Sequence, residues 1–529
     1  MLFRSLIVIS GVSVPGNYLG GKPIRFTELK GIAQSFPEAT KILCGPATKF
    51  GVGEEGGKPS IPVERLGNSY DLIIKGDAEI ALLSLMKDGA LQDYPPQEME
   101  QIINCSRESM DLIHTMAIDG AKIVLQHPNF ATNDTAAGLG GNLVCEIETF
   151  RGCPRYLSGG CAFCVEPLKG PPIHREIDSI VAEVKTLYEF GVRHFRLGAQ
   201  TDFYAFQHGE YLNQRYPIPN PDAIEKLLKL IRAACPEIKT LHIDNVNALN
   251  FALYPSEADR ITQKIAEYCT AGNIAAIGVE SVDEKVIKTN NLKASEDQVF
   301  EAIKVINKYG KKIGKNGLPK FLPGLNFIMG LPGETHETLN KDRAFLLRLL
   351  ENDLWVRRIN LRKYLVSQAS SRESEQTSPD LQGSIKIKPQ ISQVHRTLAK
   401  NEKFYFTFKE KIREEVDFPM LQRIFPMGRR LIGVYAEIHE GNGTFLRQPG
   451  TYPILCFVPR ELPLNQYYNL VVIDHGYRSI TCLVDPVDFT ALSLKELEAI
   501  QGIGKKRAIA LTQKRPKTQG EWREILPED

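Results

Sequence analysis

Short runs of apolar, mostly β-branched residues alternate with amphipathic stretches along the N-terminal part of the chain. SLIVIS at 5–10 precedes a glycine- and proline-rich turn and the amphipathic RFTELKGIAQSF at 25–36. TKILC at 40–44 and YDLII at 70–74 repeat the pattern. Strand-like runs that alternate with helix-like stretches predict a parallel sheet with crossover helices. We therefore expect an α/β fold here, a Rossmann-like doubly wound domain over residues 1–130.

The same alternation continues through the middle of the chain. At least six strand–helix units lie between about 142 and 362, among them IAAIGVESVDEKVIKTNN at 274–291 and LPGLNFIMGLPGET at 322–335. Units of this kind curl into β/α barrels, whose sites form at the carboxyl ends of the strands. We expect a partial β/α barrel over residues 140–365.

The C-terminal part follows a different pattern. The polar, serine-rich stretch at 367–388 has no apolar period and predicts a long connection, within a linker and helical or irregular segment at 366–450. Short alternating runs such as YYNLVVIDHGYRSITCLVD predict a small β domain at 451–488. LSLKELEAIQGIGKKRAIALTQKRP predicts two helices joined by a Gly-x-Gly turn, within 489–529.

Composition and charge narrow the possible functions. The 529 residues exceed the usual size of one core, and 43% hydrophobic with 24% charged residues is typical of globular proteins. A net charge of +2 predicts no general attraction to nucleic acid, so any basic surface must be local. The apolar run LIVIS is too short for a signal peptide, and no stretch is long enough for a membrane helix. Ten dispersed cysteines do not resemble a secreted disulfide framework, so we expect a cytoplasmic protein with reduced thiols.

Three of the ten cysteines are set close together among glycines and prolines. Cys153, Cys161 and Cys164 lie in RGCPRYLSGGCAFC, and the chain has no second CxxC pair that would complete a structural zinc site. Thiolates are soft ligands for zinc or iron–sulfur clusters. Three ligands with an open fourth position suit a site that binds something else as well. Cys145 is a possible fourth ligand, but its strand-like surroundings NLVCEIETF favour packing in the sheet.

This cysteine segment resembles that of the radical S-adenosylmethionine (radical SAM) superfamily. The usual spacing there is CxxxCxxC with an aromatic residue before the last cysteine, and the three thiolates hold a [4Fe–4S] cluster whose fourth iron binds S-adenosylmethionine. The sequence here keeps the Cys-Pro pair and Phe163, but it has four extra residues between Cys153 and Cys161. The insertion ends in Gly159-Gly160 and could loop out without moving the ligands. The alternative is that the cysteines bind zinc or no metal.

Further pieces of the resemblance follow in the family's order. FIMGLPGET at 327–335 is similar to a late barrel strand with its turn, and IGVESVDEKVIKTNN at 277–291 to the family's GxES unit. RLGAQTDFYAF at 196–206 stands where the family's GGE turn contacts the methionine amine, and it looks more like the methylthiotransferase branch. LHIDNVNA at 241–248 fits the strand that touches the ribose. The resemblance implies S-adenosylmethionine contacts from Phe163, Gly198, Gln200, Asp202, Asp244, Asn245, Glu280, Ser281 and Gly330.

The N-terminal segment resembles the domain that precedes the barrel in cobalamin-dependent radical SAM proteins. The LGG loop at 19–21, the Gly-Pro pair at 45–46 and GDAE at 76–79 match in order. Glycine turns at strand ends let the backbone approach a flat ring or a phosphate closely. The signature DxHxxG, which supplies an axial histidine, is absent, and the first histidine of the chain is His114. Many members of the family lack that histidine, so the resemblance leaves cobalamin binding open. The alternative is a domain that keeps the fold without the cofactor.

The final helices resemble a helix-hairpin-helix motif, which would complete a three-part radical SAM protein of archaeal type. The hairpin GIGKK predicts phosphate contacts from Gly502, Gly504, Lys505 and Lys506. Such contacts bind the phosphate backbone of a nucleic acid independently of its base sequence, and the binding weakens as the salt concentration rises. The strands at 451–485 are similar to an OB-like or TRAM-like barrel. The alternative is a small packing or protein-contact domain.

Together these features predict a radical SAM enzyme that modifies an inert carbon of a macromolecule, most readily RNA or tRNA, by methylation or a related reaction. It would draw electrons from a donor such as ferredoxin or flavodoxin. Only Cys44 and Cys105 precede the barrel region, so sulfur insertion by a second cluster is disfavoured. One alternative is a cobalamin-dependent C-methyltransferase acting on a protein side chain or small molecule. The other is a non-enzymatic nucleic-acid-binding iron–sulfur protein.

Overall fold

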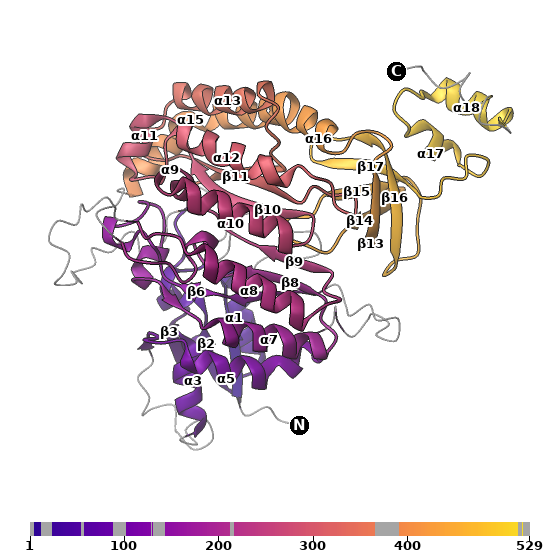
Figure 1. Ribbon diagram of the computed structural model, residues 1–529. Coiled ribbons are helices and arrows are strands. Elements are labelled where there is room, and N and C mark those ends of the chain that lie inside the picture. Colours follow the sequence, from indigo (N-terminus) through magenta and orange to yellow (C-terminus); the bar gives the residue numbers. More distant parts are fainter. Residues whose placement is uncertain are drawn as a thin grey trace.

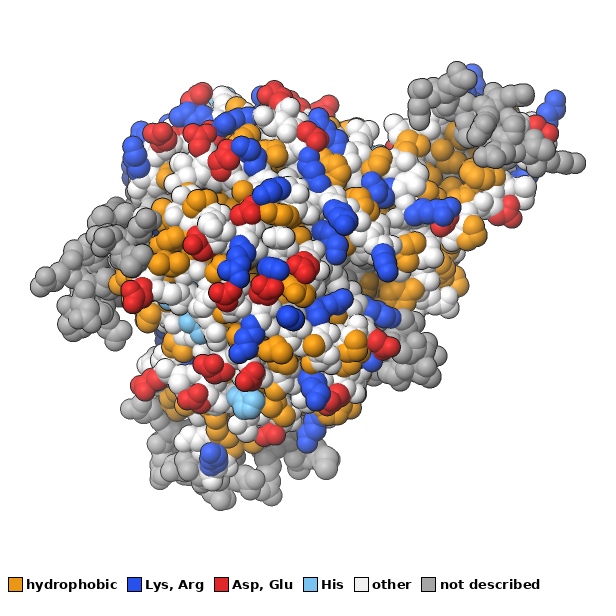
Figure 2. All heavy atoms as spheres, in the orientation of Figure 1, with side chains coloured by type: hydrophobic (Ala, Val, Ile, Leu, Met, Phe, Trp, Pro, Cys, Tyr) orange, Lys and Arg blue, Asp and Glu red, His pale blue; other side chains and the backbone are white. Residues whose placement is uncertain are grey.

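The computed structural model describes residues 5–11, 24–53, 58–87, 102–127, 130, 143–211, 216–365, 391–516 and 521. Figure 1 shows an N-terminal α/β sheet below a central curved sheet wrapped by helices, with a small β-barrel and two short helices at the C-terminal end. The face seen in Figure 2 mixes basic and acidic side chains over the central helices, in keeping with the net charge of +2. Among the described residues, none of the helices combines the length and apolarity needed to span a bilayer.

The N-terminal sheet is entirely parallel in its described part. Its strands stand in the order β1 (Ser5–Ile9), β2 (Thr40–Cys44), β3 (Leu72–Gly76) and β4 (Ile102–Cys105). The flanking helices are α1 (Phe26–Ser35), α2 (Pro46–Phe50), η1 (Val63–Ser69) and α3 (Ala78–Lys87). Two further helices, α5 (Asp111–Gly120) and η2 (Ala121–Gln126), pack against the central half barrel instead.

Because successive side chains point to opposite faces of a strand, this sheet supports two apolar cores. Leu43 and Ile73 pack with α1 and η1, whereas Ile42 and Ile74 pack with α3. Helices on both faces agree with the expected three-layer α/β domain. The described strands stand side by side in chain order. Hydrophobic runs predict that strands exist but not which strands are neighbours, so the sequence could not decide this point.

Six parallel strands form the central half barrel in the described part of the chain, as the sequence predicted. They are β5 (Val144–Glu148), β8 (His194–Gly198), β9 (Thr240–Ile243), β10 (Asn273–Glu280), β11 (Phe321–Met329) and β12 (Arg358–Lys363). Backbone N–H of Val246 donates to the carbonyl of Ala276 at 2.9 Å and joins the two halves of the sheet between β9 and β10. The covering helices are α7 (Ile177–Glu189), α8 (Pro221–Ala234), α9 (Leu249–Leu253), α10 (Pro255–Tyr268), α11 (Glu284–Thr289), α12 (Glu296–Gly310) and α13 (His336–Glu351).

Local sequence explains where the covering helices begin. Asn220 caps α8 through its side-chain oxygen, and Pro221 follows at the first helical position, where its missing N–H costs nothing. Ser295 and Thr335 close capping boxes at α12 and α13. The apolar stripes of these helices pack on one continuous core with the strands. The rigid layer positions the strand ends, where the candidate site lies.

A long helix and a small closed barrel follow. Helix α15 (Ile391–Ile412) runs through a π turn, η7 (Arg413–Asp417), into α16 (Phe418–Ile424). The barrel order is β13 (Arg430–Glu440), β14 (Gly443–Arg447), β15 (Leu455–Val458), β17 (Ser479–Val484) and β16 (Tyr467–His475). Only the β15–β17 pair is parallel, as in a five-stranded Greek-key barrel of the OB kind.

The barrel begins earlier than the expected boundary at 451, because β13 and β14 fall in the segment predicted to be linker and irregular. Gly433 takes a positive φ of 70°, the register shifts between Leu431 and Val434, and the last three residues of β13 are exposed. These features break the alternation that would reveal a strand. The serine-rich connection expected at 367–388 lies outside the described residues.

The two closing helices are α17 (Leu494–Glu498) and α18 (Lys505–Gln513), joined by a turn in which Gly502 has a φ of 85°. Leu497, Ile503 and Leu511 share a core with Ile473 and Leu483 of the barrel. The helices therefore belong to the small barrel's surface. Figure 1 shows them at the opposite end of the molecule from the N-terminal sheet.

Candidate active site

The three clustered cysteines lie beyond the carboxyl end of β5. The chain first forms a short antiparallel pair, β6 (Phe150–Arg151) with β7 (Ile173–His174), and the cysteine loop, residues 153–164, lies between these strands. Cys153 and Cys161 are buried, and all ten cysteines of the chain are free thiols. Burial raises the pKa of Cys153 to about 11 and that of Cys164 to about 12, with the nearby Cys161 adding to both shifts. The loop thus gathers three soft donors in one protected place.

The insertion within the cysteine motif is an ordered turn. Tyr156–Ser158 form a short 3-10 helix, η4, and Gly159 and Gly160 follow with φ of 76° and 66°. A Cβ on Gly160 would lie 2.1 Å from the ring of Pro167, so only glycine fits. The side-chain amide of Asn291 donates to the carbonyls of Ser158 at 2.8 Å and Gly160 at 2.6 Å. The extra residues therefore loop out and leave the cysteines together, as the glycine pair indicated.

A half-buried lysine that the sequence did not single out, Lys293, lies near the clustered cysteines. Burial alone lowers the pKa of Lys293, but Cys161, Glu280 and the other two thiols outweigh burial and raise it. A Cβ on Gly278 would lie 2.9 Å from Nζ of Lys293 and 2.4 Å from Oε1 of Glu280, so the glycine leaves room for both charges. Burial raises the pKa of Glu280 itself to about 7. The ammonium group of Lys293 therefore lies near enough to the three thiols for their charges to interact.

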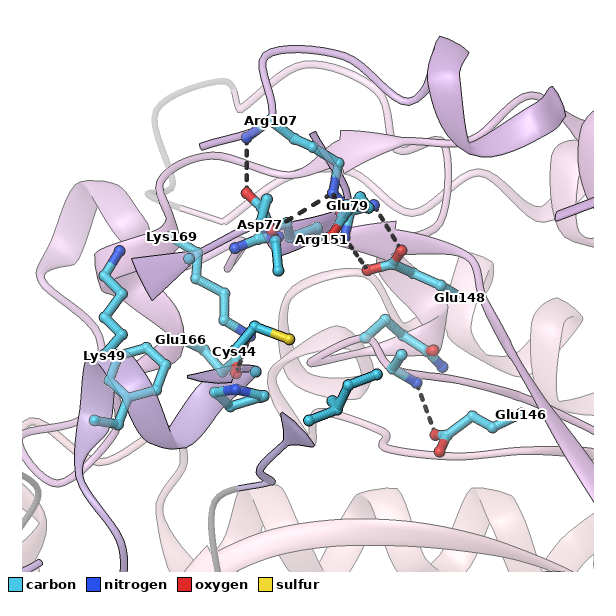
Figure 3. Close-up of a pocket in the computed structure, with 18 of the residues that line it drawn as sticks. Cys44, Lys49, Asp77, Glu79, Arg107, Glu146, Glu148, Arg151, Glu166 and Lys169 are labelled. Atoms are coloured by element: carbon cyan, nitrogen blue, oxygen red, sulfur yellow. Dashed lines mark hydrogen bonds and ion pairs between the residues drawn. The ribbon is translucent and has the colours of Figure 1, made fainter. Parts of the chain in front are cut away.

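A chamber of about 660 Å³ opens between the N-terminal sheet and the half barrel (Figure 3). It is lined by Arg151 and Glu166, which flank the cysteine loop, but by none of the three clustered cysteines. It lies at the carboxyl ends of strands from both sheets, where α/β folds place their ligands. The N-terminal wall includes Cys44, Gly45, Gly76, Asp77 and Glu79. The barrel wall includes Glu146, Glu148, Arg151, Gln200, Thr201, Asp244 and Asn245.

Glycines shape the N-terminal wall at two strand ends. Gly45 and Gly76 have φ of 95° and 98°. A Cβ would lie 2.7 Å from the carbonyl oxygen of Ser10 at the first position and 2.0 Å from that of Cys105 at the second. The Gly-Pro and GDAE turns of the sequence therefore line the chamber as close-packed backbone. The LGG loop at 19–21 lies outside the described residues.

Ion pairs fasten the N-terminal sheet to the barrel at the chamber edge. Arg107 lies 2.8 Å from Glu79 of the N-terminal sheet and 2.8 Å from Glu148 at the end of β5. Arg151 of the barrel pairs with Asp77, which also accepts the backbone N–H of Arg107 at 2.7 Å. Figure 3 shows these side chains converging on one another. The side chains of Arg107 and Asp77 are only 10% and 3% exposed, so the pairs act with little solvent screening.

The small C-terminal barrel reaches the opposite side of the chamber wall through the loop at 448–454. Thr451 donates its N–H to Nδ1 of His242 at 3.0 Å, and the hydroxyl of Tyr452 lies 3.3 Å from Asp244. Arg196 pairs with Asp244, and the Arg358 guanidinium lies 4.3 Å from the ring centroid of Tyr452. The C-terminal segment therefore supports a residue that lines the chamber.

The predicted S-adenosylmethionine residues fall into two groups. Gln200, Asp244 and Asn245 line the chamber, and the side-chain amide of Asn245 holds the carbonyl of Gln200 at 2.7 Å. Glu280 lies beside Lys293, close to the thiols. Phe163 packs half-buried on the core, and Gly198 provides room for the Glu146 carboxylate.

Three other predicted residues have structural partners instead. Asp202 is buried and accepts hydrogen bonds from Tyr204, Asn247, Asn250 and Tyr216. The hydroxyl of Ser281 donates to Asp342 at 3.1 Å. Gly330 donates its N–H to Glu334 at 2.9 Å and faces Leu398, which a Cβ would meet at 2.3 Å. None of the three lines the chamber.

The hairpin residues are far from the chamber. Gly504 caps α18, and Lys505 and Lys506 are exposed at its first turn. Arg507 turns back to the carbonyl of Gly502 at 3.1 Å. The amides and positive charges are thus available at a surface, and their role with nucleic acid stays a prediction.

The donor set fits an iron–sulfur cluster with S-adenosylmethionine. The fit rests on the chemistry of the donors, three soft thiols on one loop, with the guanidinium of Arg155 donating to Sγ of Cys161. Cys145 lies within β5 opposite Phe195 and packs in the sheet, as its surroundings indicated. Cobalamin is a different case: the described chamber lining contains no histidine to supply an axial imidazole, and Cys44 is its one soft donor on the N-terminal side.

Sequence comparison gives two informative relatives. An uncharacterised protein of Archaeoglobus fulgidus is 37% identical over 502 residues, which cover 94% of this chain and 82% of that protein. A tRNA-2-methylthio-N(6)-dimethylallyladenosine synthase of Anaplasma phagocytophilum is 24% identical over 222 residues, 40% of this chain and 41% of that enzyme.

Among solved structures, the radical S-adenosylmethionine methyltransferase TsrM of Kitasatospora setae aligns at 16% identity with a TM-score of 0.40. The alignment covers 68% of this chain and 62% of TsrM, and a likeness at this level carries no inference about cofactor or substrate. The sequence profile of the radical SAM superfamily matches residues 147–346, which include the cysteine loop and most of the half barrel. The chain therefore belongs to the radical SAM superfamily, whose enzymes use a [4Fe–4S] cluster and S-adenosylmethionine.

Proposed function

We propose that this enzyme cleaves S-adenosylmethionine reductively and modifies an inert carbon of an RNA, with tRNA as the first candidate, by methylation or a related reaction. The observation that carries the proposal is the position of Cys153, Cys161 and Cys164 on one loop beyond β5, at the strand ends that also border the chamber. A [4Fe–4S] cluster with S-adenosylmethionine supplies, when reduced by one electron, a 5′-deoxyadenosyl radical that takes hydrogen from an unreactive carbon.

The residues around the loop and chamber have distinct tasks in this proposal. The three cysteines would hold the cluster, and Lys293 lies where it can balance their negative charge. Gln200, Asp244 and Asn245 offer polar groups to S-adenosylmethionine from the strand ends. The N-terminal sheet forms one wall of the chamber and is fastened to the half barrel through Arg107 and Arg151.

RNA is the favoured substrate because of the C-terminal segments. A five-stranded barrel with OB-like strand order is a frequent platform for single-stranded nucleic acid. Exposed Lys505, Lys506 and Arg507 add positive charge on a helix beside that barrel, in a chain whose net charge is only +2. The relative from Anaplasma phagocytophilum is a tRNA-modifying synthase. These features support RNA over a small molecule.

The test is anaerobic turnover by protein reconstituted with iron and sulfide. With a strong one-electron reductant we expect 5′-deoxyadenosine to form from S-adenosylmethionine, and Cys161→Ala to abolish it. Mass spectrometry of tRNA from cells with and without the gene then identifies the modified nucleoside. Absence of 5′-deoxyadenosine from cluster-loaded protein with tRNA present would overturn the proposal. If a protein is modified and RNA is not, the substrate is a protein rather than RNA.

A second candidate is a cobalamin-dependent C-methyltransferase acting on a protein side chain or small molecule. It is favoured by one observation, the chamber shared by the glycine-lined ends of β2 and β3 and the ends of the barrel strands. Corrinoid absorbance that stays with the purified protein, together with RNA binding that is absent or independent of salt, would favour this candidate over the first.

A further inference from the structure

The cysteine loop carries an arginine, two residues after Cys153, that contacts two of the three clustered sulfurs. The backbone N–H of Arg155 donates to Sγ of Cys153 at 3.4 Å. Its guanidinium Nη1 donates to Sγ of Cys161 at 3.0 Å. Arg155 is only 7% exposed. Arg155 stands just before the four extra residues, 157–160, whose turn is held by Asn291.

The guanidinium is fixed from its other side. Nη2 of Arg155 donates to the backbone carbonyl of Asn291 at 3.0 Å and to its side-chain oxygen at 3.2 Å. Asn291 adopts the left-handed region with a φ of 47°, which asparagine tolerates better than most residues. The side-chain amide of the same Asn291 holds the turn of the insertion through Ser158 and Gly160. One residue therefore fixes both the arginine and the loop that carries it.

The positive charge of Arg155 is directed at sulfur. Among the ion pairs of the described residues, none involves Arg155, so no carboxylate neutralises it within ion-pair distance. Hydrogen bonds and positive charge at cysteinyl sulfur stabilise the more negative, reduced form of an iron–sulfur cluster and raise its reduction potential. Arginine stays charged at any pH of interest and presents a rigid fork, so it acts as a permanent donor.

We propose that Arg155 is a positioning residue that holds Cys153 and Cys161 and raises the potential at which the cluster accepts an electron from a low-potential one-electron donor. The inference rests on the proposed function, since it needs the cluster at these cysteines. The electron enters the cluster and leaves with the cleavage of S-adenosylmethionine, so Arg155 itself is neither oxidised nor reduced.

The experiment compares the midpoint potential of the cluster in wild type, Arg155→Met and Arg155→Lys, followed by electron paramagnetic resonance during an anaerobic redox titration. For Arg155→Met we expect a midpoint about 59 mV more negative, which is a tenfold loss in the equilibrium constant for a one-electron reduction. Arg155→Lys keeps the charge without the fork and is expected between the two. Formation of 5′-deoxyadenosine should slow with a weak donor and recover with a strong one.

Arg193→Met is the matched control, because Arg193 is also partly buried but donates to the carbonyls of Tyr188 and Val192 at the amino end of β8. It should leave the potential unchanged. A wild-type potential in fully loaded Arg155→Met would overturn the inference. If Arg155→Met cannot hold the cluster, the test uses Arg155→Lys and Asn291→Ala, the second of which frees the guanidinium. Wild-type midpoint potentials in both of these variants would overturn the inference. A wild type that takes up no cluster would instead overturn the proposed function.

Discussion

The hydroxyl of Tyr452 lies 3.3 Å from Oδ1 of Asp244, and through this contact the small C-terminal barrel supports the chamber wall. Asp244 follows β9, whereas Tyr452 belongs to the loop between β14 and β15. Arg196 pairs with Asp244 and lies 3.7 Å from Glu146, whose carboxylate accepts the N–H of Ala199 at 2.9 Å. A chain of polar contacts thus leads from the C-terminal barrel to the turn after β8.

Removing the Tyr452 hydroxyl tests this chain of contacts. Tyr452→Phe loses one hydrogen bond to a charged partner, so we expect S-adenosylmethionine to bind about fivefold more weakly, the effect of about 1 kcal/mol. Equilibrium binding to the cluster-loaded protein measures it. Tyr468→Phe is the control, because its hydroxyl bonds the carbonyl of Pro463 within the same barrel. Equal affinities for the two variants would show that the C-terminal barrel does not position Asp244.

Arg107 joins the N-terminal sheet to the half barrel, and its loss should loosen that junction. Arg107→Ala removes the ion-pair partner of Glu79 and Glu148 and leaves Asp77 with Arg151 alone, which costs about 2 kcal/mol. Thermal and denaturant unfolding should show a transition that moves to lower temperature or separates into two. Lys288→Ala, which breaks a pair with side chains 81% and 86% exposed, should change stability by less than about 0.5 kcal/mol. Similar unfolding of both variants would contradict this role of Arg107.

The buried Asp342 makes stability depend on pH. Burial raises the pKa of Asp342 to about 8. Between about pH 4 and pH 8 the unfolded chain has released this proton while the folded chain keeps it, so the free energy of unfolding falls as pH rises. Asp342→Asn cannot ionise, and its melting temperature should therefore decline less over this range than that of wild type. Parallel profiles for the two proteins would show that Asp342 is ionised in the folded state.

RNA binding should depend on salt through the hairpin. Lys505 and Lys506 are exposed at the first turn of α18. If each contacts a phosphate, the double variant Lys505→Ala/Lys506→Ala lowers the slope of log affinity against log salt by about 1 to 2. Filter binding or fluorescence anisotropy with tRNA at several salt concentrations gives the slope. Lys285→Ala/Lys288→Ala on α11, away from the hairpin, is the control, and equal slopes for the two double variants would argue for a packing role of the hairpin.

The sequence predicted the half barrel and the cysteine loop well because both signals are local. The strands at 142–362 appear as short apolar runs between amphipathic helices, and the three cysteines lie within twelve residues, 153–164. The glycine pair at 159–160 also indicated that the insertion would loop out. By contrast, the order of strands in the N-terminal sheet depends on pairing across long stretches of chain, which apolar runs do not report.

The residues that the sequence missed act across long distances in the chain. Arg155 meets Asn291, 136 positions away, and Tyr452 meets Asp244, 208 positions away. Lys293 follows the recognised GxES segment at 277–291, but its closeness to the thiols appears only when β10 and the cysteine loop come together. Asp202 is the opposite case. Its place in a recognised motif predicted a contact with S-adenosylmethionine, whereas its carboxylate oxygens accept hydrogen bonds from the buried Asn247 and Asn250.

The central claim is that Cys153, Cys161 and Cys164 hold a cluster that leaves one iron open to S-adenosylmethionine. Electron paramagnetic resonance of the reduced, reconstituted protein, recorded with and without S-adenosylmethionine, tests this claim most directly. The account predicts a [4Fe–4S]⁺ signal that changes on adding S-adenosylmethionine and is lost in Cys161→Ala but kept in Cys145→Ala. A signal that ignores S-adenosylmethionine, or one that survives in Cys161→Ala, would contradict it.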